Sequence, residues 1–194
     1  DELFEGGNNL EDTNEIALRL EASGLLDYLS ISCGCANVGH VFTPTMVVPP
    51  GYQVYLAAAI KGAVKNIPVF TVGRINDPIM AEKIIADGQA DMVGMTRATI
   101  CDPEMPTKAR EGRFDDIRHC VACNQRCVGS ITRGRPVTCV QNPSVGREQL
   151  LGAASLRPAV SKKTVMVVGG GPAGMEAARV AAMRGHRVKL YEST

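Results

Sequence analysis

Four closely spaced cysteines constrain this chain more than any other feature of its sequence. They follow the pattern Cys120-x2-Cys123-x3-Cys127-x11-Cys139, with glycines in the long gap before the last of them. Three thiols so close in sequence can face one centre, and a fourth that returns after a turn can close its other side. A four-iron cluster takes one thiolate at each of its corners. The spacing therefore predicts that these cysteines bind a [4Fe–4S] cluster.

Two other interpretations of the four cysteines stay open. Zinc also accepts four thiolates, but structural zinc sites usually present their ligands as two pairs, whereas this run has three close ligands and a separate fourth. The thiols could also lie together without any metal. Disulfides are disfavoured because the chain has seven cysteines, an odd number, and because cofactor motifs flank the run.

The composition is that of an ordinary globular protein. Of the 194 residues, 45% are hydrophobic and 21% are charged, with a formal net charge of +1. This is enough apolar material for a core, and there is no excess of positive charge for binding nucleic acid. No segment approaches the roughly 18 apolar residues of a membrane span. We therefore expect a cytoplasmic protein without a nucleic-acid or membrane partner.

The first half of the chain alternates helices with short apolar strands. Asp77 and Pro78 suit the N-cap and the first position of a helix. Such an alternation is typical of parallel strands joined by crossover helices, an α/β fold. Helices are expected at 10–23, 53–65, 78–88 and 102–111, and strands at 25–31, 69–72 and 90–95.

Two of these strands are followed by an arginine, in Gly73-Arg74 and in Thr96-Arg97. In a (β/α)8 barrel, the loops after strands 7 and 8 commonly hold a phosphate group. Backbone amides and two guanidinium groups would suit a phosphate monoester. The alternative is that each arginine pairs with a carboxylate on the rim of the barrel.

A second motif lies near the end of the chain, where Gly169-x-Gly171-x-x-Gly174 follows a strand expected at 164–168. A helix is expected at 172–183 and a second strand at 187–191, with Glu192 at its end. In this context the glycines allow a dinucleotide pyrophosphate to approach the helix N-terminus, and the acid suits a ribose hydroxyl. The motif predicts nucleotide binding and leaves FAD, NAD and ADP open.

The remaining histidines and cysteines carry weaker signals. His40 follows the first strand, on the face where a barrel has its active site, although a lone loop histidine is more often structural than catalytic. Cys33 and Cys35 are interpreted as ordinary loop thiols, and Cys101 as a packing residue after the third strand.

The order of these parts resembles the iron–sulfur flavoenzymes related to old yellow enzyme. The resemblance rests on ADMVGMTRATICDPE, on CVACNQRC and on VMVVGGGPAG, and it extends over essentially the whole chain. This NADH:flavin oxidoreductase family includes 2,4-dienoyl-CoA reductase and trimethylamine dehydrogenase, and the cysteine spacing is more similar to the reductase branch.

The resemblance implies four segments. Residues 1–118 would be the C-terminal part of an FMN-binding (β/α)8 barrel, and residues 119–150 the [4Fe–4S] segment. A connector at 151–162 would lead to the start of a Rossmann-like FAD- or NAD(P)-binding domain at 163–194.

The resemblance also implies roles for individual residues. His40 lies only near the position of the proton-donating histidine of the reductases, so its catalytic role is a weaker expectation. The residues expected to hold cofactors are Gly73, Arg74, Thr96 and Arg97 for the FMN phosphate, the four cysteines for the cluster, and Gly169, Gly171, Gly174 and Glu192 for FAD, or for ADP.

The implied function is oxidoreduction of a small molecule with NAD(P)H as electron donor. Electrons would pass from FAD through the cluster to FMN and reduce an activated C=C bond, as in 2,4-dienoyl-CoA reductase. One alternative is the oxidation of a methylated amine at FMN. A second, from another class, is a non-enzymatic zinc-binding linker.

The chain is expected to be an internal piece of a longer polypeptide. Only three barrel strands are recognisable, whereas a (β/α)8 barrel has eight, so the whole protein would be roughly three times as long. An open half-barrel exposes strand edges. We therefore expect the 194-residue piece alone to be poorly stable and inactive.

Overall fold

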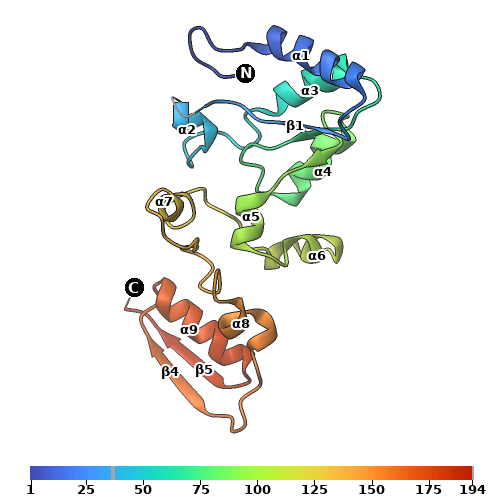
Figure 1. Cartoon of the computed structure of the whole chain (residues 1–194). Coiled ribbons are helices and arrows are strands. Elements are labelled where there is room, and N and C mark those ends of the chain that lie inside the picture. The colour runs from blue at the N-terminus through green and yellow to red at the C-terminus, as the bar shows by residue number, and fades with distance from the viewer. Residues whose placement is uncertain (36–37, 194) are drawn as a thin grey trace. The chain divides into compact units, whose positions relative to one another are not determined.

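In the computed structural model, residues 1–35 and 38–193 are described, and the chain divides into two compact units, Asp1–Asn142 and Pro143–Thr194 (Figure 1). The division falls inside the expected cluster segment, and all four cysteines of the run lie in the first unit. Within the described residues, no helix is long and apolar enough to cross a membrane. The expected domain boundaries stay predictions.

The first unit is built on a parallel sheet in the order β1-β2-β3. Its strands are β1 (Leu29–Ile31), β2 (Val69–Thr71) and β3 (Met92–Val93), and Leu29 pairs with Val69 at the start of the register. The parallel order confirms the alternation expected from the sequence.

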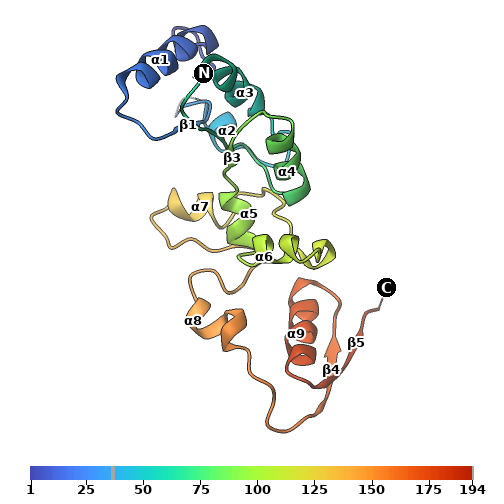
Figure 2. The ribbon, with the colours of Figure 1, turned by 90° about the vertical axis from the view of Figure 1, so that its right-hand side faces the viewer.

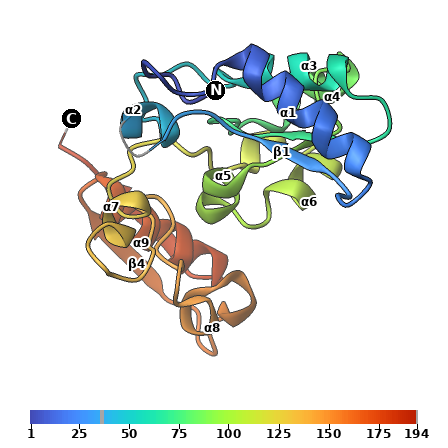
Figure 3. The same ribbon diagram turned by 45° about the horizontal axis from the view of Figure 1, so that its top comes forward.

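Helices connect and cover these strands. Helices α1 and α3 pack against each other on the sheet, as Figure 3 shows from above. The helices of this unit are α1 (Leu10–Ser23), α2 (Gly39–Phe42), α3 (Val54–Ala63), α4 (Pro78–Ala86), α5 (Thr96–Cys101), α6 (Met105–Arg110) and α7 (Val128–Ile131), with a 3-10 turn at Phe114–Asp116.

Local sequence explains where the longer helices begin. The side chain of Asn9 accepts hydrogen bonds from the first turn of α1, and the Asp12 carboxylate accepts one from the backbone N–H of Asn9, which makes a capping box. Asp77 Oδ1 accepts a hydrogen bond from the N–H of Ile79 at 2.9 Å, so the predicted cap of α4 is confirmed.

Most predicted elements of the first unit were too long, and the third strand, expected at 90–95, spans only Met92–Val93. The first strand begins at Leu29 and not at 25, because Leu25 is 84% exposed and lies outside the core. The fourth predicted helix begins at Met105, because the Asp102 side chain binds the N–H of Glu104 and holds a turn there. Helix α5, which begins at Thr96, was not predicted.

The core of the first unit is divided into small clusters. One joins α1, α3 and the first two strands through Ala17, Ile60 and Val69. A second joins the N-terminus of α3 to α4 and the residues before β3. A third, made by Ala98, Met105 and Ile117, packs α5 and α6 against the start of the cysteine segment.

The second unit is a βαβ element. Strands β4 (Thr164–Val168) and β5 (Arg187–Tyr191) pair in parallel, and α9 (Pro172–Met183) covers one face of the pair (Figure 2). These bounds are those expected from the sequence. Two short elements precede β4: the helix α8 (Glu148–Leu151) and a 3-10 turn at Ala153–Ser155.

We predict that a peptide of residues 143–194 does not fold cooperatively by itself. None of the side chains that the structure describes in this range is buried, and Val168 is 77% exposed. A piece this small buries too little of its surface on folding to be more than marginally stable by itself. Circular dichroism during heating should show a gradual change, and a sharp transition would contradict this prediction.

Candidate metal centre

The cysteine segment crosses the first unit with little regular structure. Ala122 and Asn124 adopt left-handed conformations, with φ of 53° and 57°, and they turn the chain on either side of Cys123. Helix α7 starts directly after Cys127. These tight turns direct neighbouring cysteines toward the same space.

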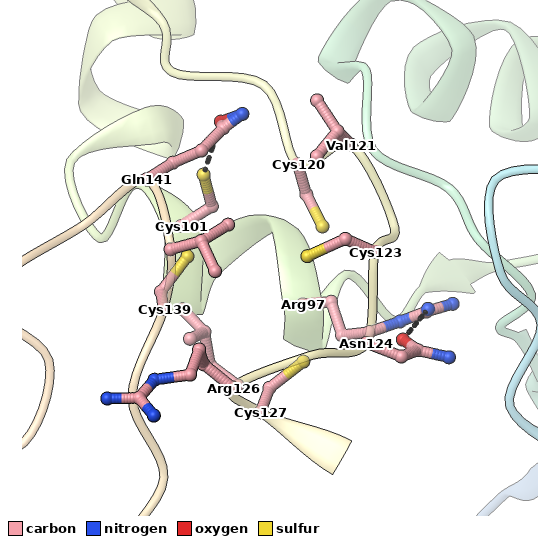
Figure 4. Close-up of a pocket in the computed structure, with 12 residues that line it drawn as sticks. Arg97, Cys101, Cys120, Val121, Cys123, Asn124, Arg126, Cys127, Cys139 and Gln141 are labelled. Atoms are coloured by element: carbon pink, nitrogen blue, oxygen red, sulfur yellow. Dashed lines mark hydrogen bonds between the residues drawn. The ribbon is translucent and has the colours of Figure 1, made fainter. Parts of the chain in front are cut away.

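That space is a pocket, and the side chains of all four cysteines line it (Figure 4). It has about 330 Å³ of empty volume, part of which is open to solvent. Arg97 and a fifth cysteine, Cys101, also line it. The structure therefore brings together the four cysteines that the sequence singled out.

The thiols surround the pocket without closing on a single point. Within the described residues, no three His, Cys, Asp or Glu side chains come close enough together to hold one metal ion. A zinc ion would need four sulfurs at about 2.3 Å from one centre. A cluster binds each thiolate through a different iron, so it suits thiols spread around a shared cavity.

The thiols of the pocket differ in acidity. The neighbouring thiol of Cys101 lowers the pKa of the Cys139 thiol; burial opposes this shift, while the N–H groups of Gln141 and Asn142 add to it. Cys101 itself donates to Gln141 Oε1 at 3.4 Å. Burial raises the pKa of Cys120, although the N–H of Ala122 donates to its sulfur at 3.4 Å.

Polar contacts fasten the two ends of the cysteine segment to the first unit. At the beginning, the carboxylate of Asp102 accepts hydrogen bonds from the N–H of Arg118 at 2.9 Å and from Lys108 Nζ at 2.7 Å. At the end, the buried side chain of Asn142 donates to the carbonyl of Ile100 at 3.0 Å.

Two further asparagines fasten the middle of the segment. Asn76, from the loop after β2, donates to the carbonyl of Cys120 at 2.6 Å. Asn124 accepts a hydrogen bond from Arg97 Nη1 at 2.7 Å and donates to the carbonyl of Thr43 at 2.8 Å. The loops after β2 and β3 therefore both hold the cysteine segment.

The loop after β2 leaves one guanidinium donor, in Arg74, without a partner among the described residues. Gly73 has a φ of 121°, and a Cβ there would collide with the side chain of Gln53, which packs against it. Arg74 donates from Nη1 to the carbonyl of Val48, while its Nε is buried without a hydrogen-bond partner. The orphaned guanidinium N–H leaves a donor for an incoming acceptor.

The second arginine lies in the first turn of α5 with Thr96. Arg97 Nη1 donates to the carbonyl of Pro44 at 2.6 Å as well as to Asn124. The ion pairs found within residues 1–35 and 38–193 include neither Arg74 nor Arg97, and both the phosphate role and the alternative of rim ion pairs stay predictions.

His40 does not join the cysteine pocket. It is exposed on α2, and residues 36 and 37 of the same loop lie outside the described residues. Nearby, the hydroxyl of Tyr52 donates to the carbonyl of Val41 and lies 3.8 Å from the sulfur of buried Cys33. Burial raises the pKa of Tyr52.

The glycine motif of the second unit has the geometry expected after a strand. Gly169 has a φ of 103°, and a Cβ at Gly174 would collide with the carbonyl oxygen of Gly169. Gly171 is the N-cap of α9. Glu192 accepts a hydrogen bond from the N–H of Gly170, which brings the acid at the end of β5 to the loop.

Sequence reasoning missed the residues that fasten the cysteine segment. Asn124 carries one signal, because an asparagine inside a metal-ligand run often marks a left-handed turn. Asp102 carries another, because an acid before a proline can hold the turn before a helix. Asn76 and Asn142 carry none, since their partners are distant in the sequence.

Comparisons with known proteins agree with this architecture. Residues 34–116 match the model of the NADH:flavin oxidoreductase / NADH oxidase family, and residues 164–194 match that of glucose inhibited division protein A. The chain belongs to the NADH:flavin oxidoreductase family.

Individual relatives match over nearly all of the chain. An NADH oxidase from Thermoanaerobacter brockii is 48% identical over 99% of this chain and 29% of its own length. An N,N-dimethylglycine/sarcosine dehydrogenase from Chromohalobacter salexigens is 40% identical over 100% of this chain and 28% of its own length.

A solved structure has the same α/β fold. A 2-naphthoyl-CoA reductase, in complex with 2-naphthoyl-CoA, is 41% identical and superposes with a TM-score of 0.90 over 97% of this chain and 28% of the reductase. The chain thus spans less than a third of the length of these three relatives.

We predict that Asp102→Asn destabilises the full-length protein by about 3 kcal/mol, because it leaves Lys108 buried without its counter-charge. The Asp102 and Lys108 side chains are 5% and 15% exposed. The matched control is Asp87→Asn, which breaks an ion pair with exposures of 44% and 72% and should cost less than about 1 kcal/mol. Equal effects in urea unfolding would contradict the prediction.

The pair of Asp102 and Lys108 also makes the stability of the protein depend on pH. Burial opposes ionisation of Asp102, but the N–H of Arg118 and the ammonium of Lys108 outweigh it and lower the pKa of the carboxyl. Its contribution to stability is therefore present above the unfolded pKa of about 3.9 and is lost as the pH falls through the lower folded value. Asp102→Asn should lack this part of the acid dependence.

Proposed function

We propose that this chain is part of an NAD(P)H-dependent flavin and iron–sulfur oxidoreductase that reduces an activated C=C bond, with electrons passing from FAD through a [4Fe–4S] cluster to FMN. The observation that carries the proposal is the shared pocket. Four cysteines line it together with Arg97, the residue expected at the FMN phosphate. Ligands for two redox groups would thus adjoin each other.

The four cysteines of the run would hold the cluster. Their number and their spread around one pocket fit a four-iron group, and the hydrogen bonds at Cys139 favour its thiolate form. A cluster carries single electrons, which lets a two-electron donor serve a second flavin that is too distant for direct hydride transfer.

The FMN phosphate would lie between the loops after β2 and β3. Arg74 offers its unpartnered Nε, Gly73 would offer its backbone N–H from the turn beside it, and Thr96 and Arg97 contribute the start of α5. In this arrangement the guanidinium of Arg97 would contact the phosphate while its Nη1 holds Asn124.

Residues 163–194 would begin a Rossmann-like domain that binds FAD, or ADP. Gly169 and Gly171 would let a pyrophosphate approach the N-terminus of α9, Gly174 lets the helix pack on β4, and Glu192 would bind a ribose hydroxyl. Support comes from the βαβ geometry and from the family match over residues 164–194.

A second candidate function is the oxidation of a methylated amine. It is favoured by the 40% identity to the N,N-dimethylglycine/sarcosine dehydrogenase, and in it electrons would leave the amine and pass outward through the same groups. The identity to 2-naphthoyl-CoA reductase and the x2, x3, x11 cysteine spacing support the reductive direction.

Two of the expectations receive less support. A non-enzymatic zinc linker is disfavoured by the spread of the thiols and by membership of an oxidoreductase family. The role of His40 as a proton donor stays a prediction, since its side chain is exposed on α2. In either direction of electron flow the substrate would be a small molecule.

The test is anaerobic absorbance of the full-length protein mixed separately with NADPH, NADH and a methylated amine such as sarcosine. We expect a nicotinamide to bleach the flavin bands, the amine to leave them unchanged, and an α,β-unsaturated acyl thioester to restore them. Bleaching by the amine alone would replace the reductase with the dehydrogenase.

We predict that Cys127→Ser lowers the rate of NAD(P)H-driven enoyl reduction at least about 100-fold, because even partners outside the metal's own ligands cost 10–100-fold when lost. Cys35→Ser is the matched control, since Cys35 does not line the pocket, and its rate should stay close to that of the wild type. Equal rates in the two variants would contradict the assignment of Cys127.

A further inference from the structure

Gln53 is a buried glutamine between the loops that follow β1 and β2. It is the N-cap residue of α3, but its side chain makes no capping hydrogen bond, and it is only 4% exposed. Its Oε1 instead accepts a hydrogen bond from the N–H of Cys33 at 2.9 Å, 20 positions away along the chain. Because a backbone N–H can only donate, the amide oxygen must face Cys33, and this fixes the orientation of the Gln53 side chain.

The fixed side chain of Gln53 lies directly against Gly73, in the loop after β2. A Cβ at Gly73 would come within 2.4 Å of Gln53 Cγ and within 2.8 Å of its Nε2. Beside this contact, the N–H of Gly51 donates to the carbonyl of Gly73 at 2.9 Å. The segment that leads into α3 therefore holds Gly73 both by packing and by a hydrogen bond.

The turn that is held in this way has an unfavourable backbone conformation. Gly73 has a φ of 121°, and Arg74, which carries a side chain, has a φ of 55°. A non-glycine residue at such a φ persists only where its surroundings hold it. Arg74 is held on one side by its hydrogen bond to the carbonyl of Val48, and on the other through Gly73. Loss of Gln53 would let the turn relax.

The donors of this turn face no acceptor of their own. Within residues 1–35 and 38–193, the backbone N–H groups of Gly73 and Arg74 make no hydrogen bond, and Arg74 Nε is buried without one. Successive free N–H groups in a turn form a concavity that binds anions. This is the loop expected at the FMN phosphate, so the conformation of the turn should decide how tightly the phosphate binds.

We propose that Gln53 is a positioning residue for the phosphate of FMN: anchored on the N–H of Cys33, it holds Gly73 and Arg74 in the turn that presents their donors. This rests on the proposed function, in which that loop binds the phosphate. Gln53 acts only through the turn and does not itself contact FMN. A flavin that lacks the phosphate should therefore bind independently of Gln53.

The test compares FMN with riboflavin, the same flavin without a phosphate, by isothermal titration calorimetry. The full-length protein is first depleted of FMN and keeps its other cofactors. In Gln53→Ala we expect the dissociation constant of FMN to rise about tenfold, because a hydrogen bond and a packing contact that hold the turn are lost. The dissociation constant of riboflavin should stay that of the wild type.

Two further variants complete the comparison. Gln53→Met keeps the length of the side chain and its packing against Gly73 but offers Cys33 only a weak sulfur acceptor, so its FMN dissociation constant should lie between those of the wild type and Gln53→Ala. Because it leaves no cavity, it also serves if the alanine variant does not fold. Gln89→Ala is the matched control: Gln89 precedes β3, at the opposite edge of the sheet, and the variant should bind both flavins like the wild type.

Several outcomes would overturn the inference. If Gln53→Ala and Gln53→Met bind FMN as tightly as the wild type, Gln53 does not hold the turn, and the proposed function stays intact. If both variants lose affinity for FMN and for riboflavin by the same factor, Gln53 only supports the fold. A wild type that binds FMN no more tightly than riboflavin would overturn the phosphate site, and one that binds neither flavin would overturn the proposed function as well.

Discussion

The buried carboxylate of Asp102 is the contact on which the start of the cysteine segment depends. It binds Lys108 and the backbone of Arg118, and so fixes the point where the chain leaves the α/β elements and enters the cysteine segment. That segment contains few buried side chains, so apolar packing contributes little to its conformation. Hydrogen bonds from Asn76, Asn124 and Asn142 hold it in place.

These contacts tie the two proposed cofactor sites together. Arg97 belongs to the loop expected at the FMN phosphate, yet it also lines the cysteine pocket and binds Asn124 between two of the cysteines. The loop after β2 likewise serves both proposed sites. Arg74 is expected at the phosphate, and Asn76 donates a hydrogen bond to the backbone carbonyl of Cys120. A fixed geometry between two redox groups is what electron transfer from one to the other requires.

The sequence predicted what depends on neighbours along the chain. The helices 10–23 and 172–183, the strands 164–168 and 187–191 and the cap at Asp77 follow from local pattern, and all were confirmed. The convergence of four cysteines followed from their spacing.

The sequence could not predict contacts between residues that are far apart along the chain. Asn124 and Thr43 are 81 positions apart, and Cys101 and Gln141 are 40 apart. No periodicity records such contacts, which is why the asparagines that fasten the cysteine segment were missed, whereas the packing role expected for Cys101 is confirmed by its burial. Strand ends are uncertain for a related reason, because burial and not propensity decided that β1 begins at Leu29.

The central claim is that the four cysteines of the run share one iron–sulfur cluster. Iron and acid-labile sulfide analysis of the anaerobically purified full-length protein, together with Mössbauer spectroscopy, tests it most directly. The account predicts about four irons and four sulfides for each chain, as a [4Fe–4S] cluster requires, and their loss in Cys139→Ser. One zinc for each chain, with neither iron nor sulfide after reconstitution, would contradict it.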